Sequence, residues 1–146
     1  MSTSTYKRPK RLWVAAVMNI LIGLMALGLL LFLLMSPRVA GELRPSGGAA
    51  ILGAVSPSFL VVTSVIALFG KPYGRNLMLL AALVFYGILI VQNVLLFGSA
   101  QSVLGQAGAT KVVVNVVRAS LELLVNLWAL LSFKTRQYFR GAPVAP

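Results

Sequence analysis

Apolar residues are gathered into four long runs, separated by short polar segments. Each run is longer than the roughly 20 apolar residues that a helix needs to cross the hydrocarbon core of a bilayer. The runs are Leu12–Met35, Ala49–Phe69, Leu77–Phe97 and Val112–Phe133. The pattern therefore predicts an all-α integral membrane protein, a four-transmembrane-helix bundle with short loops in one membrane domain over residues 12–133.

Turn-forming residues mark the connections between the runs. Pro37 ends the first run, because proline cannot continue a helix beyond its first turn. The first run also exceeds the apolar core of a signal peptide, about 7–15 residues, and is expected to be a retained anchor. Short loops are expected at 36–48, 70–76 and 98–111, with Thr110 as the N-cap of the fourth helix.

Charge adds an orientation to this picture. The chain is 59% hydrophobic with a mean hydropathy of +0.93, and 13 Lys and Arg face only 2 acids. Most cations flank the first run, the second connection and the tail: Lys7, Arg8, Lys10, Arg11, Lys71, Arg75, Lys134, Arg136 and Arg140. The positive-inside rule then predicts a cytoplasmic segment 1–11 and a cytoplasmic tail 134–146. The expected location is a bacterial-type inner (plasma) membrane, crossed several times.

The tail alternates basic and aromatic residues. Arg136, Tyr138, Phe139 and Arg140 are expected to lie on the anionic inner face of the membrane. The other interpretation is a stop signal after the last helix, in which the cationic side chains extend to the membrane–water interface. Apart from Arg118, the cations of the chain occupy short flanks of apolar helices, and no nucleic-acid-binding motif accompanies them. The expected surroundings are therefore the lipid bilayer and no nucleic acid.

Polar residues inside the fourth run form a stripe along one helix face, namely Asn115, Arg118, Glu122 and Asn126. Such a stripe must face the bundle or a partner protein, because charged groups in lipid are costly. At about 1.5 Å per residue, Arg118 is expected about 9 Å and Glu122 about 15 Å below the outer end of the helix. The third run offers Tyr86, Gln92 and Asn93 at similar depths. A buried polar core linking these three residues with Asn115, Arg118 and Glu122 is therefore predicted.

The first run also carries a polar residue, Asn19, which lies among small residues on one helix face. Ala15, Gly23 and Ala26 complete this ladder, which favours close approach of a second helix. The Asn19 amide is then placed to bond across the interface, at the level of Asn126.

The missing residue types restrict the chemistry. The chain has no Cys and no His, and its only acids are Glu42 and Glu122. Thiolate and imidazole catalysis, paired carboxylates and the usual metal sites therefore lack their ligands or bases. No catalytic residue, metal or cofactor is expected, and the protein is not expected to be an enzyme.

Three functions remain after these exclusions. The leading hypothesis is a small accessory subunit, regulator or immunity-type protein that binds another membrane protein, or a second copy of itself, through the polar stripe. The alternative is a small oligomeric transporter or channel in which Glu122 couples proton movement. The third and weakest is a lipid- or quinone-handling enzyme that relies on Glu122, Tyr86 and Arg118.

Overall fold

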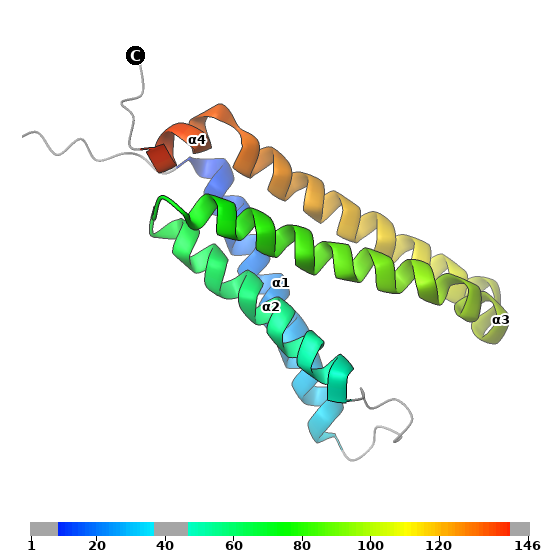
Figure 1. The fold of residues 1–146 in the computed structure, drawn as a ribbon. Helices are drawn as coiled ribbons and strands as arrows, with labels where there is room; N and C mark the ends of the chain where they lie inside the picture. Colours follow the sequence, from blue (N-terminus) through cyan, green and yellow to red (C-terminus); the bar gives the residue numbers. More distant parts are fainter. Residues whose placement is uncertain (1–8, 37–46, 141–146) are drawn as a thin grey trace, which may run out of the picture.

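A computed structural model describes residues 9–36 and 47–140, except for the side chains of 98–105 and of Arg140. Apart from short turns, the described chain is helical. Four helices follow one another along these ranges (Figure 1): α1 (Lys10–Met35), α2 (Gly47–Leu68), α3 (Gly74–Leu131) and α4 (Phe133–Arg140). Parts of three predicted segments lie outside the described residues. They are 1–8 of the basic N-terminal segment, 37–46 of the first loop and 141–146 of the basic tail.

Four segments are long and apolar enough to cross a membrane. They are Lys10–Met35, Gly47–Leu68, Gly74–Phe97 and Gln106–Leu131. Each overlaps one of the apolar runs, with ends that differ by a few residues. The prediction of four long apolar helices, typical of a multi-pass membrane protein, is confirmed. The cytoplasmic placement of the termini stays a prediction.

The prediction of a loop at 98–111 is wrong, because the backbone of α3 stays helical from Gly74 to Leu131. A straight helix of 58 residues would be about 87 Å long. Instead Met78, near its start, packs in one cluster with Leu130, near its end. The helix is thus folded back into two arms (Figure 1). Segment 98–111 contains no proline to break the helix, and Thr110 bonds to the Gln106 carbonyl at 2.9 Å instead of capping a new helix.

Both pairs of helical segments, α1 with α2 and the two arms of α3, meet at one end of the molecule, which we call the closed end. The N-terminus of α1, the turn between α2 and α3, and α4 all lie there (Figure 1). A buried apolar cluster joins them: Leu12, Ala15, Ala16, Ala67, Met78, Ala129, Leu130 and Phe139. A second cluster continues the core toward the middle of the helices: Leu60, Ala81, Ala82, Phe85, Tyr86 and Ala119. Small residues in both clusters allow the backbones to lie close together.

Beyond the second cluster the two pairs diverge (Figure 1). We call this part the splayed end: residues 27–35 of α1, 47–56 of α2, and 91–97 and 106–118 of α3. Among the residues described in these ranges only Gly108 is buried as a whole, although the Ser56 hydroxyl oxygen is buried and has no hydrogen-bond partner. The bundle is therefore closed at one end and open at the other.

The C-terminal helix α4 covers the closed end. The chain leaves helical geometry at Ser132, and Thr135 Oγ1 then donates to the Ala129 carbonyl at 2.7 Å. Gly70 in the α2–α3 turn has a φ of +70° and lies against the Tyr138 ring, where an added Cβ would be 2.6 Å from the hydroxyl oxygen. A side chain at Gly70 would therefore be both strained and obstructed.

The expected place of the tail aromatics on the membrane surface is wrong for Phe139, which is 8% exposed inside the closed end. Tyr138 stacks edge-on against it at a centroid distance of 5.1 Å. Residues three and four apart share a helix face, so Thr135, Tyr138 and Phe139 turn inward together. Arg136 remains exposed, and the Arg140 side chain lies outside the description.

Candidate functional site

The polar stripe lies on the second arm of α3, and its exposure rises from the closed end to the splayed end. Asn126 is fully buried. The Glu122 side chain is 16% exposed and the Arg118 side chain is 62% exposed, and Asn115 is exposed as well. The gradient follows the divergence of α1 from this arm (Figure 1). One helix face is therefore buried at its Asn126 end and exposed at its Asn115 end.

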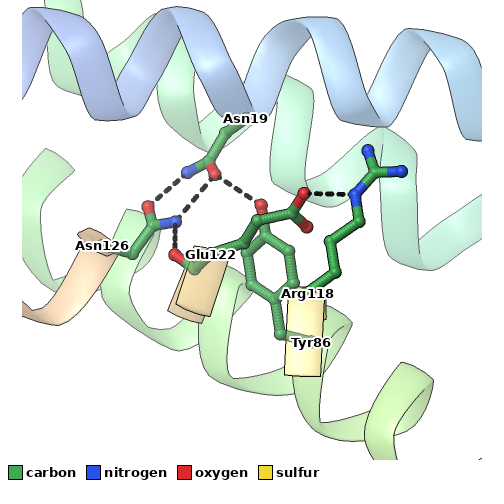
Figure 2. Close-up of polar contacts among 5 residues, drawn as sticks. All are labelled: Asn19, Tyr86, Arg118, Glu122 and Asn126. Atoms are coloured by element: carbon green, nitrogen blue, oxygen red, sulfur yellow. Dashed lines mark hydrogen bonds and ion pairs between the residues drawn. The ribbon is translucent and has the colours of Figure 1, made fainter. Parts of the chain in front are cut away.

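The inner part of the stripe belongs to a buried polar cluster of Asn19, Tyr86 and Asn126 (Figure 2). The two amides are reciprocal: Asn19 Nδ2 donates to Asn126 Oδ1 at 2.7 Å, and Asn126 Nδ2 donates to Asn19 Oδ1 at 3.0 Å. Tyr86 Oη also donates to Asn19 Oδ1, at 3.0 Å. All three side chains are fully buried, and together they join α1 to both arms of α3.

Small residues on α1 place Asn19 in this cluster. Gly23, one turn further, lies so close to α2 that an added Cβ would be 2.5 Å from Val61 Cγ2 and 3.1 Å from the Pro57 carbonyl oxygen. Ala15 is fully buried in the closed end, and Ala26 packs beside the second cluster. The ladder thus holds α1 near its neighbours at the depth where the amides meet.

The outer part of the stripe is an ion pair. Arg118 Nε donates to Glu122 Oε1 at 2.8 Å, one turn apart on the same arm. The backbone carbonyl of Glu122 accepts from Asn126 Nδ2 at 2.9 Å, so the pair adjoins the buried polar cluster (Figure 2). No hydrogen bond joins the two terminal nitrogens of Arg118 to any described residue. The guanidinium therefore keeps most of its donors for another molecule.

The polar core expected from the sequence is not formed as proposed. Tyr86 bonds to Asn19 and not to the ion pair. Gln92 and Asn115 are exposed, and Asn93 Nδ2 donates to the Leu89 carbonyl of its own helix at 2.8 Å. The two arms of α3 run side by side here (Figure 1), but apolar side chains line the space between them, among them Val94, Phe97 and Val116. Polar side chains at this level therefore face outward or bond to their own helix.

The ion pair also lies farther along its helical segment than expected. Because α3 stays helical through 98–111, the second arm does not begin at Val112, and Arg118 lies about 18 Å beyond Gln106. The sequence placed Asn19 and Asn126 at the same level, and their amides do meet. It assigned Tyr86 to the ion pair, whereas Tyr86 joins these amides.

The chemistry available at this site is that of hydrogen bonding and charge pairing. Among the described residues no group of three His, Cys, Asp or Glu side chains could hold a metal ion. The buried polar cluster satisfies its own donors and acceptors, whereas the ion pair offers a guanidinium and one carboxylate oxygen to whatever lies beside it. Comparisons with protein-family models, with curated proteins and with solved structures found no match to this chain.

Proposed function

We propose that this chain is a non-catalytic membrane protein that works by binding another transmembrane helix at its splayed end. The observation that carries the proposal is the 62% exposure of Arg118 in the middle of an apolar helix. A guanidinium that faces lipid at such a depth is costly. A partner helix that covers it and accepts its hydrogen bonds removes that cost.

The surroundings of Arg118 support a helical partner. Val114, Leu121 and Val125, which border the stripe on the same arm, are between 38% and 58% exposed. An occupant therefore meets an apolar surface with one polar stripe, which suits an apolar helix that carries a carboxylate or amide at matching depth. The carboxylate or amide oxygen would accept from the Arg118 terminal nitrogens, and an amide group of the partner could reach Asn115.

The distribution of cations supports a cytoplasmic closed end. Six described cations lie near it: Lys10, Arg11, Lys71, Arg75, Lys134 and Arg136. Lys111 is the one described cation near the far turn of α3, apart from Arg118 within the span. By the positive-inside rule this arrangement favours a protein of a bacterial-type inner membrane with its splayed end in the outer leaflet. The partner, another membrane protein or a second copy, would then dock in that leaflet.

Photo-crosslinking in native membranes tests the proposal. A photoreactive residue replaces Asn115, on the stripe, or Val113, which is 48% exposed at almost the same depth but lies about 160° around the helix from Asn115. We expect a discrete protein adduct from position 115, lost on Arg118→Leu, and none of comparable yield from position 113. Equal yields from both positions, or a yield insensitive to Arg118→Leu, would contradict docking on the stripe. The mass of the adduct distinguishes a second copy of 15.6 kDa from another protein.

A proton-linked transporter or channel is the second candidate. It is favoured by the partial exposure of Glu122, at 16%, beside a buried polar cluster that closes the path toward α4. Assembly of several copies would be needed, because four helices enclose little space. The test is pH-driven flux into liposomes. A flux abolished by Glu122→Gln supports this candidate, whereas a flux unchanged in that variant removes Glu122 from the mechanism.

A further inference from the structure

A groove of about 520 Å³ lies between α1 and the second arm of α3, at the closed end. It is lined by Arg11, Leu124, Leu127, Trp128, Leu131 and Phe133, together with Ser132. Its apolar residues on the arm recur along one side over about 10 Å, from Leu124 to Leu131, and its one charged residue, Arg11, comes from the start of α1. An elongated apolar surface beside one cation suits a lipid.

Arg11 lies at the position of a headgroup ligand. Its guanidinium carbon is 4.1 Å from the centroid of the Trp128 ring, a cation–π contact that orients the planar group. No acidic residue pairs with Arg11 in the described ranges, where Arg118–Glu122 is the one ion pair found. A guanidinium held in this way offers the paired donors that fit a phosphate.

The groove walls are open to the outside. Trp128 is 57% exposed and Phe133 is 72% exposed, and tryptophan is enriched where a membrane helix meets the headgroups. Lys10 and Lys134 are exposed close by in the sequence, and no described acid lies at this end. The local charge therefore favours a headgroup with a net negative charge over a zwitterionic one.

We propose that this groove binds one anionic phospholipid, with the phosphate on Arg11 and an acyl chain along Leu127 and Leu124. A second groove of about 310 Å³ between the arms of α3 is the useful contrast. It is lined by Val94, Phe97 and four valines of the segment 112–117, and it offers no group that could recognise a headgroup. The lipid site depends on neither the ion pair nor a protein partner, so it is independent of the proposed function.

Native mass spectrometry of the full chain in a neutral detergent tests the site, with phosphatidylglycerol and phosphatidylcholine as the two probes. We expect one phosphatidylglycerol to be retained in preference to phosphatidylcholine. Arg11→Ala should weaken phosphatidylglycerol binding about fivefold, and Arg11→Lys should restore part of it. Trp128→Ala should weaken it as well, because the guanidinium loses its support.

Arg75→Ala is the matched control, because Arg75 lies at the same end but bonds to Asn76 Oδ1 through Nε and Nη2. That variant should change binding by less than about twofold. An equal loss in Arg75→Ala, or equal retention of the two lipids by the wild type, would overturn the site in favour of diffuse charge attraction. Full competition by glycerol phosphate would overturn the acyl-chain part. Circular dichroism of each variant verifies that the helices are retained.

Discussion

The closed end and the splayed end are built from the same helices and treat their polar residues in opposite ways. At the inner limit of the stripe, Asn19 and Asn126 exchange two hydrogen bonds and are fully buried. Two turns away on the same face, Arg118 is 62% exposed. The main difference between the two positions is whether another helix packs opposite the polar side chain. The chemistry of the side chains themselves differs less. Burial at the closed end stabilises the chain, whereas at the splayed end the terminal nitrogens of Arg118 have no partner among the described residues.

The largest difference between the two ends should come from Phe139. Phe139→Ala should lower the free energy of unfolding by about 3 kcal/mol or more, since it removes a buried ring from the closed end. The matched control is Phe133→Ala, at the other end of α4, where the ring is 72% exposed. Titration with a denaturing detergent, followed by circular dichroism, gives both values. Equal losses would mean that α4 does not cover the closed end.

Next in size is Asn19→Ala, which leaves Tyr86 Oη and the Asn126 amide without their common partner. We expect a loss of about 2 kcal/mol, because unpaired buried polar groups are costly. Asn93→Ala serves as the control at the splayed end, since Asn93 bonds to its own helix, and should cost less than about 0.5 kcal/mol. A double-mutant cycle of Asn19→Ala with Asn126→Ala should show coupling. Additive losses would contradict a shared cluster.

Gly23→Ala probes the close approach of α1 and α2. The new methyl would meet Val61 and the Pro57 carbonyl oxygen, and we expect a loss of about 1 kcal/mol from the strain. Gly28, on the same helix but toward the splayed end, has no atom within 4 Å of an added Cβ. Gly28→Ala should therefore be neutral or slightly stabilising. The same denaturing titration compares them, and a loss in both would place the effect in α1 itself.

The smallest effect on stability is expected from Arg118→Leu. A mostly exposed ion pair contributes about 0–1 kcal/mol, so the purified variant should unfold within about 1 kcal/mol of the wild type. The crosslink from position 115 should nevertheless be lost. A large loss of stability in the isolated chain would show that the ion pair holds the bundle together. It would contradict the proposed difference between the closed end and the splayed end.

Much of the fold could be predicted from the sequence because it depends on local properties. The length and apolarity of a run decide whether it can span a membrane, and the four runs correspond to four described segments. Spacing of four residues on one helix also brought Arg118 and Glu122 within reach of each other, as the 2.8 Å contact bears out. The prediction for the tail was wrong at Phe139, because an alternation of basic and aromatic residues fits both a lipid surface and a protein core.

The candidate site could be predicted only in part. The stripe was visible as a periodic set, but its division into a buried half and an exposed half was not. Gln92, Asn93 and Asn115 had matching depths and still do not meet Arg118 or Glu122. Depth along a helix follows from residue number, whereas the face that each helix turns toward its neighbour depends on how all four segments pack.

The sequence by itself determined the number of apolar helices, the helix face that carries the stripe and the pairing of Arg118 with Glu122. Tertiary structure decided that α3 folds back on itself, that α4 covers the closed end and that Asn19 joins Tyr86 and Asn126. The physical reason is that helix formation and apolar length are properties of a segment. The burial of a polar group depends on which distant residue comes to satisfy it, here one that is 107 positions away.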